Sequence, residues 1–93
     1  PSLPKDAMVE VPCYLRAWGP EPVVIGEIPT FYKGMIENQL AFEKLAVDAV
    51  FENSYQKALE ALTLNRTIPS AKVARQLLDA LKEANKEYWP ELN

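Results

Sequence analysis

The chain has 93 residues, of which 48% are hydrophobic and 25% charged, with a net charge of −3 at pH 7. These values predict one segment, 1–93, with the composition of a soluble globular protein and no affinity for nucleic acid or a membrane surface. Histidine is absent and the three glycines form no phosphate-binding motif, so we expect no catalysis by this chain alone. The single cysteine and a start without a signal-peptide core predict a cytoplasmic location.

Residues 8–26 are predicted to form a β-hairpin. Apolar residues alternate over 8–15, which is typical of a strand with one buried face. The turn-rich stretch 16–22 follows, and the β-branched residues 23–25 predict the second strand. Pro12 cannot donate a hydrogen bond, so we expect an edge strand there. A lone hairpin is marginal in water and needs a helix or further strands to cover it.

Three helices are predicted after the hairpin, over 29–52, 55–65 and 71–88. Pro29 is placed as the first residue of the first helix, where its missing N–H is not needed. That helix would be ~35 Å long, which is long for a compact domain of this size. It must therefore bend or extend along something larger. Serines are predicted to cap the second and third helices: Ser54 and Ser70. The fold class is α+β.

The predicted buried stripe of the first helix consists of Ile28, Phe31, Met35, Phe42, Leu45, Ala46 and Ala49. The second helix is predicted to bury Tyr55, Leu59 and Leu62, and the third to bury Val73, Ala74, Leu77, Leu78, Leu81 and Ala84. Each set recurs at the spacing of one helix face. We therefore expect these faces to pack together.

Cys13 could act as a nucleophile or a metal ligand, but the structural interpretation is favoured. A cysteine on the apolar face of a strand is commonly an inert core residue. No histidine is present to activate it, and no second cysteine to share a metal. Paired carboxylates would serve a glycosidase, yet no spacing places two of the following across one cleft: Glu10, Glu21, Glu27, Glu37 and Glu43. These are interpreted as solvated.

Aromatic and basic residues in the predicted loops and near the C-terminus have similar alternatives. Trp18, in a loop, could stack on a sugar or pack on a neighbouring element. Arg66 could bind a phosphate with two hydrogen bonds, although an arginine at a helix end more often binds carbonyls or a partner. Tyr88 and Trp89 are expected to anchor the end of the chain to a surface.

Five stretches carry a family resemblance: 8–13, 18–22, 28–35, 62–74 and 83–92. Together they are similar to the C-terminal part of glycoside hydrolase family 4, over nearly the whole chain. The stretches 19–22 and 31–34 look more like the 6-phospho-α-glucosidases of that family, also called maltose-6′-phosphate glucosidases, than the 6-phospho-β-glucosidases. The resemblance implies that the hairpin and helices complete the C-terminal domain of a lactate/malate-dehydrogenase-like enzyme.

The chemistry that the resemblance implies is unusual for a glycosidase. Bound NAD⁺ takes a hydride from C3 of the phosphorylated sugar, and a tyrosine removes the acidified C2 proton. The leaving group is eliminated, water adds at C1, and the hydride returns. Mn²⁺ polarises the sugar oxygens. Phosphorylated disaccharides such as maltose 6′-phosphate would give glucose 6-phosphate.

None of the family's functional residues can be assigned to this chain. The NAD-binding loop lies upstream, as do the metal-binding cysteine and histidine and the catalytic tyrosine. Cys13 lacks the Asn or Asp that follows the family's cysteine, and no tyrosine here matches the catalytic motif. No catalytic, cofactor-binding or metal residue is therefore predicted.

The expected partners are the remainder of the enzyme polypeptide and further copies of it, as a homo-oligomer. NAD and Mn²⁺ are expected for the parent enzyme and not for the segment alone. Two alternatives stay open. One is a 6-phospho-β-glucosidase of the same family, and the other is a non-catalytic helical interaction module.

Overall fold

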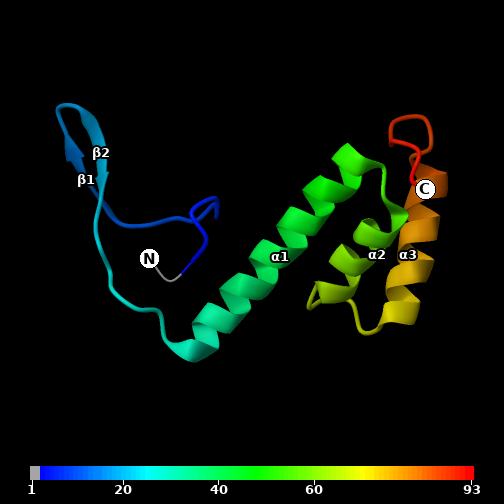
Figure 1. The fold of residues 1–93 in the computed structure, drawn as a ribbon, viewed down its shortest axis with the longest axis horizontal. Coiled ribbons are helices and arrows are strands. Elements are labelled where there is room, and N and C mark those ends of the chain that lie inside the picture. The colour runs from blue at the N-terminus through cyan, green and yellow to red at the C-terminus, as the bar shows by residue number, and fades with distance from the viewer. Residues whose placement is uncertain (1–2) are drawn as a thin grey trace.

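The computed structural model describes residues 3–93. It contains two strands and three helices: β1 (Cys13–Arg16), β2 (Gly19–Pro22), α1 (Thr30–Glu52), α2 (Tyr55–Leu64) and α3 (Ala71–Ala84). The predicted order, an N-terminal hairpin before three helices, is confirmed. The molecule is elongated, with extents of 48 × 31 × 18 Å. Its radius of gyration of 17.1 Å exceeds the value of about 13 Å for a compact domain of this length. Figure 1 shows the hairpin and α2–α3 at opposite ends.

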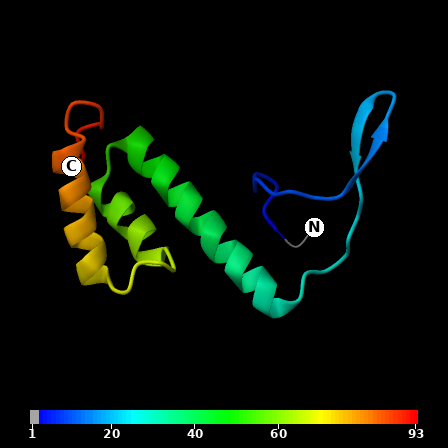
Figure 2. The same cartoon turned by 180° about the vertical axis from the view of Figure 1, so that it is seen from behind.

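The three helices form one packed unit in which α2 lies between α1 and α3, as both views show (Figures 1 and 2). The buried core is Leu59, Ala74 and Leu78, surrounded by Tyr55, Ala58, Leu62, Ile68 and Leu92. Ala49 of α1 and Ala61 of α2 are also buried. Alanines let helix backbones approach closely, so α1 packs on α2 through small side chains. The predicted inner face of the second helix is confirmed, and that of the third is confirmed at Ala74 and Leu78. It is wrong at three other predicted positions, which are exposed because only one edge of α3 packs on α2: Val73, Leu77 and Ala84.

Helix α1 extends well beyond the end of α2. It has 23 residues against 10 in α2, and each residue adds about 1.5 Å to either helix. The first turns of α1 are therefore uncovered. Phe31 is 69% exposed and Met35 38% exposed, although both lie on the predicted buried stripe. The stripe prediction is wrong at this end because nothing among residues 3–93 reaches it.

The helix ends are set by local hydrogen bonds. The Oγ atoms of Ser54 and Ser70 accept from the N–H groups of Lys57 and Val73, at 3.1 and 3.2 Å, which confirms both predicted caps. α1 is followed by Asn53, which ends the helix by adopting the left-handed conformation (φ 53°, ψ 43°). These local signals explain why the predicted limits of the helices are close to the observed ones.

Three helix limits differ from the prediction. Pro29 is the residue before α1 and not its first residue. α2 ends at Leu64 and not at residue 65. α3 ends at Ala84, four residues early, because the backbone of Asn85 leaves the helical conformation (φ −116°, ψ 18°). The side chain of Asn85 donates to the backbone oxygen of Leu81 at 2.9 Å, and a turn follows.

The hairpin is shorter than predicted, and its second strand is different. β2 is formed by 19–22 and not by the β-branched residues 23–25. A two-residue turn at 17–18 brings Gly19, which has φ +118°, opposite Arg16. This positive φ suits glycine, and the tight turn then pairs the proline-containing stretch with β1. The predicted buried face is also wrong, since every residue of β1 is exposed.

No helix among residues 3–93 has the length and apolar character needed to cross a membrane.

Candidate functional site

Cys13 does not lie in a protein core. Its side chain is exposed, and its Sγ atom is 3.5 Å from the backbone oxygen of Val11. The expectation of a buried core cysteine is wrong because the hairpin stands apart from the helices (Figure 1). Within residues 3–93, no group of three or more His, Cys, Asp or Glu side chains could hold a metal ion. Cys13 therefore has no companion ligands in this part of the chain.

The candidate carboxylates lie on separate elements and do not converge. Glu21 of β2 binds Arg16 at 2.8 Å, while Glu37 lies 3.6 Å from Lys33 within α1. Glu43 accepts a hydrogen bond from Gln39 at 3.3 Å. Glu10 and Glu27 are exposed in the extended segments on either side of the hairpin. This arrangement matches solvated surface carboxylates and not the facing pair of a glycosidase.

Trp18 and Arg66 lie in turns on different parts of the molecule. Trp18 is 78% exposed at the tip of the hairpin. Arg66 is exposed in the turn that follows α2. That turn is organised by Asn65, whose Oδ1 atom accepts from the N–H and the hydroxyl of Thr67, at 2.9 and 2.7 Å. The structure does not bring the tryptophan and the arginine into one site.

The two aromatic residues near the C-terminus behave differently. Tyr88 is 85% exposed, whereas Trp89 is 38% exposed and lines an apolar hollow with side chains of all three helices. Leu92 lies beside the same hollow and packs on the core. The predicted anchoring of the chain end is therefore confirmed for Trp89, on this chain's own helices, and is wrong for Tyr88.

A cluster around Tyr55 was not predicted as a unit. Its hydroxyl lies 2.8 Å from Oδ1 of Asp79, and the cationic groups of Arg75 and Lys82 lie 5.8 and 5.0 Å from its ring. The hydrogen bond to Asp79 raises the pKa of the Tyr55 phenol. The 75, 79, 82 spacing places these three α3 residues on one helix face. This spacing could be seen in the sequence. Only the packing of α2 on α3 shows that the ring of Tyr55 lies against these three residues.

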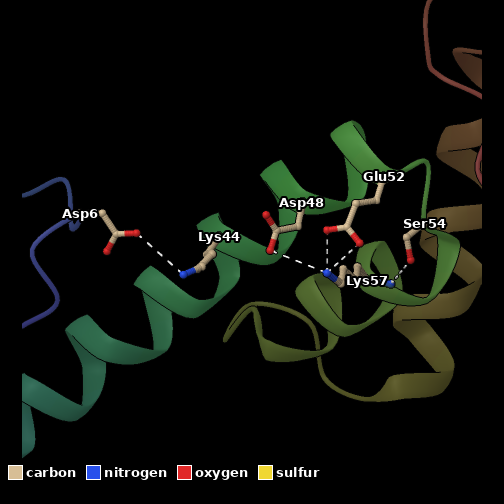
Figure 3. Close-up of polar contacts among 6 residues, drawn as sticks. All are labelled: Asp6, Lys44, Asp48, Glu52, Ser54 and Lys57. Carbon is tan, nitrogen blue, oxygen red and sulfur yellow. Dashed lines mark hydrogen bonds and ion pairs between the residues drawn. The ribbon is translucent and has the colours of Figure 1, made fainter.

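A second polar cluster braces the connection between α1 and α2, as Figure 3 shows. Nζ of Lys57 lies 2.7 Å from Glu52 and 3.9 Å from Asp48. The hydrogen bond to Glu52 raises the pKa of Lys57. Farther along α1, Lys44 lies 3.8 Å from Asp6 of the N-terminal segment. These contacts are exposed ion pairs that orient neighbouring elements. Asp6, Lys44 and Asp48 also line an open hollow between the N-terminal segment and α1.

The remaining prominent feature is the uncovered apolar surface near the N-terminus. It is carried by the hairpin, its flanking segments and the first turns of α1, and its largest exposed side chains are Met8, Leu15, Trp18, Val24, Ile25 and Phe31. Neither strand contacts a helix among the described elements. A surface of this kind is typical of an interface and not of a solvent-facing side.

The sequence comparison identifies the class of protein that carries such a segment. Residues 1–68 match the family described as "Family 4 glycosyl hydrolase C-terminal domain". The chain therefore belongs to glycosyl hydrolase family 4, as the resemblance predicted. The match covers the hairpin, α1 and α2, and α3 lies beyond it.

Individual relatives narrow this assignment. The phospho-α-glucosidase PagL of Clostridium acetobutylicum is 62% identical over 89 residues, which make up 96% of this chain and 20% of that protein. A 6-phospho-α-glucosidase from gut microorganisms, solved in complex with NAD and glucose 6-phosphate, is 59% identical. Its TM-score is 0.90, over 99% of this chain and 21% of the other. A second, solved with NAD and Mn²⁺, is 54% identical, with a TM-score of 0.91 and the same coverage. This chain thus spans about a fifth of the length of its relatives.

A relative that is named a 6-phospho-β-glucosidase has a lower sequence identity to this chain. The probable 6-phospho-β-glucosidase of Bacillus subtilis is 40% identical over 90 residues. The two alignments span 89 and 90 residues, so the two identities compare nearly the same length of this chain.

Proposed function

We propose that this chain is the C-terminal part of a 6-phospho-α-glucosidase. The whole enzyme would hydrolyse phosphorylated α-glucosides such as maltose 6′-phosphate and release glucose 6-phosphate, using NAD and Mn²⁺. The single observation that carries this proposal is the identity of 62% to a phospho-α-glucosidase, against 40% to a probable 6-phospho-β-glucosidase. The solved 6-phospho-α-glucosidases that share its fold, in complexes with NAD, glucose 6-phosphate or Mn²⁺, add support.

The role of the segment itself would be structural. Its 93 residues contain no histidine and no glycine-rich dinucleotide loop, and residues 3–93 offer no cluster of metal-binding side chains. These residues do not fit an NAD or Mn²⁺ site, and no step of the reaction is assigned to them. We propose that NAD, the metal and the catalytic groups are all held by the remainder of the enzyme.

The proposal includes a cytoplasmic enzyme assembled from several copies of the whole chain. The support for assembly is a second apolar patch near the C-terminal end of α1. Val47, Val50 and Phe51 are 53%, 54% and 83% exposed there. Side chains of this kind are normally covered when they gather on one helix.

The test is a single polypeptide in which this chain replaces the last fifth of the Clostridium acetobutylicum phospho-α-glucosidase. Hydrolysis of maltose 6′-phosphate and of a β-linked phosphorylated glucoside is measured with NAD and Mn²⁺ present. We expect turnover of the α-linked substrate at a rate close to that of the unmodified relative. The isolated 93-residue chain is expected to show none.

Two results would contradict the proposal in different ways. A chimera that prefers the β-linked substrate would move the chain to the 6-phospho-β-glucosidases. A folded, NAD-binding chimera without turnover, together with an isolated chain that folds as a stable monomer, would favour the helical interaction module.

A further inference from the structure

The hairpin has one edge whose hydrogen-bonding groups are directed away from its partner strand. The N–H of Val23 donates to the backbone oxygen of Pro12 at 2.9 Å, just beyond the paired residues. Antiparallel strands alternate between hydrogen-bonded and non-hydrogen-bonded pairs. Pro12 and Val23 therefore form a hydrogen-bonded pair, and every second pair after it is of the same kind. The backbone groups of Tyr14 and Arg16 thus bond to β2. The backbone groups of Cys13 and Leu15 must therefore point to the outer edge of β1.

The outer edge of β2 has no such donors. The residues paired with Cys13 and Leu15 are Pro22 and Pro20, and proline has no N–H. Prolines are a common means of blocking an edge strand against further pairing. One side of this two-stranded sheet is thus closed to strand addition, and the β1 side has both donors and acceptors.

The two faces of the hairpin also differ in polarity. Directly opposed residues share a face, so Cys13, Leu15, Pro20 and Pro22 lie together on an apolar face. The other face carries Tyr14 with Glu21, and Arg16 bonds to Glu21 at 2.8 Å and lies 5.1 Å from the ring of Tyr14. Leu15, in the apolar set, is 88% exposed. A hairpin of two four-residue strands with an uncovered apolar face is not stable by itself.

The position of the hairpin is reproduced in much longer chains. Two solved 6-phospho-α-glucosidases match 99% of this chain with TM-scores of 0.90 and 0.91, yet this chain covers only 21% of each. Within residues 3–93, no contact between strand and helix sets that position. The larger remainder of the same polypeptide is present in every copy of such an enzyme, so it is available to supply the missing contacts in each molecule.

We propose that the outer edge of β1 pairs with an extended strand from the remainder of the enzyme polypeptide. The added strand bonds to the backbone groups of Cys13 and Leu15, and the sheet grows on the β1 side only. The apolar face of the hairpin is covered in the same assembly. This inference rests on the proposed function in one respect, because it takes its partner from the whole family 4 enzyme.

The test measures backbone hydrogen exchange in the chimera described above. The amides of Cys13 and Leu15 are expected to exchange at least about tenfold more slowly in the chimera than in the isolated chain. Pro20→Ala provides a control inside the same hairpin, because it places an N–H on the outer edge of β2. That amide is expected to stay unprotected.

A pair of variants separates the backbone group from the side chain. Leu15→Pro removes an N–H that makes no bond to β2, whereas Leu15→Ala keeps the N–H and removes most of the side chain. We expect Leu15→Pro to reduce the protection of Cys13 by about tenfold relative to Leu15→Ala, the effect of losing one paired hydrogen bond. Equal effects of the two variants would overturn strand pairing.

The outcomes distinguish this inference from the proposed function. If Cys13 and Leu15 exchange as fast as position 20 of Pro20→Ala while turnover is intact, the edge proposal is wrong and the function stands. Protected amides without turnover would leave the edge proposal standing and contradict the function. Protection in a concentration-dependent dimer of the isolated chain would make a second copy the partner and overturn the proposal. If the chimera does not fold, the same amides are followed while the isolated chain is titrated with the separately expressed remainder of the relative.

Discussion

Asn93 donates its backbone N–H to the backbone oxygen of Asn53 at 2.8 Å, which ties the last residue to the end of α1. The backbone oxygen of Asn93 in turn accepts from the N–H of Tyr55 at 3.0 Å, one of the donors that the start of a helix leaves unpaired. Leu92, next to this tie, packs on the core of α2 and α3. The C-terminal residues are therefore part of the helical unit and not a loose tail.

Leu92→Ala should destabilise the helical unit. The leucine is partly buried against Leu59, Ala74 and Leu78, so its truncation removes apolar contacts and leaves a small void. We expect the unfolding free energy to fall by about 1–3 kcal/mol, measured by urea denaturation followed by circular dichroism. The neighbouring exposed Glu91→Ala is the control, with a change within about 0.5 kcal/mol. Equal effects of the two variants would mean that the C-terminal residues do not pack as described.

Tyr55→Phe should remove a pH-dependent contribution to stability. The hydrogen bond to Asp79 raises the pKa of the folded-state phenol, so the folded chain holds this proton more tightly than the unfolded chain. The contribution is fully present below the unfolded pKa near 10 and is lost as the pH rises through the folded value. We expect the variant to be less stable by up to about 1 kcal/mol at pH 8, with a difference that shrinks above pH ~10.

The control for this prediction is Tyr88→Phe, because Tyr88 is 85% exposed. Its stability should follow that of the original chain at every pH. Unfolding curves at several pH values between neutral and strongly alkaline give both comparisons. A difference for Tyr55→Phe that grows with alkaline pH would contradict the described hydrogen bond.

Asn53 should tolerate glycine and reject a β-branched residue. Its backbone is left-handed, a conformation that asparagine and glycine adopt readily and that β-branched residues resist. Asn53→Val is expected to lower the unfolding free energy by about 1–2 kcal/mol, and Asn53→Gly to leave it nearly unchanged. Thermal denaturation of the two variants side by side measures the difference. If valine were as stable as glycine, the end of α1 would have another conformation.

Ser70→Ala should weaken the start of α3. The serine hydroxyl accepts from the N–H of Val73 at 3.2 Å, and alanine leaves this donor unpaired. The expected loss is about 1 kcal/mol in urea denaturation. Ser70→Asp is the matched control, since aspartate can accept the same hydrogen bond and its charge suits a helix N-terminus. A loss of stability in the aspartate variant equal to that of alanine would argue against a capping role.

The helices could be predicted from the sequence because their signals are local. Ser54 and Ser70 cap α2 and α3 as predicted, and the apolar spacing correctly places Leu59 and Leu78 in the core. The family could also be predicted, because the similarity to its members extends along 96% of the chain. The expectation that no catalytic group lies in this chain remains a prediction.

The hairpin shows the limit of such local reasoning. The β-branched residues 23–25 have the stronger strand propensity, but the two-residue turn at 17–18 selects the register and pairs Gly19–Pro22 with β1. Cys13 is exposed for a different reason, because burial depends on what covers a strand and not on its alternation. The exposure of Cys13 therefore depends on residues outside the hairpin.

By itself, the sequence determined the order of the elements and the helix caps, which depend on residues close together in the chain. It also determined the family, which depends on residue identities and not on contacts. The tertiary structure alone decided that Asn93 meets Asn53, that Tyr55 meets Asp79, and that the hairpin stands free of the helices. The first two are contacts between segments far apart in the chain, and the third is the absence of such a contact. Such relations depend on how whole helices pack, because the free energy of burying a face is shared among all the side chains that cover it.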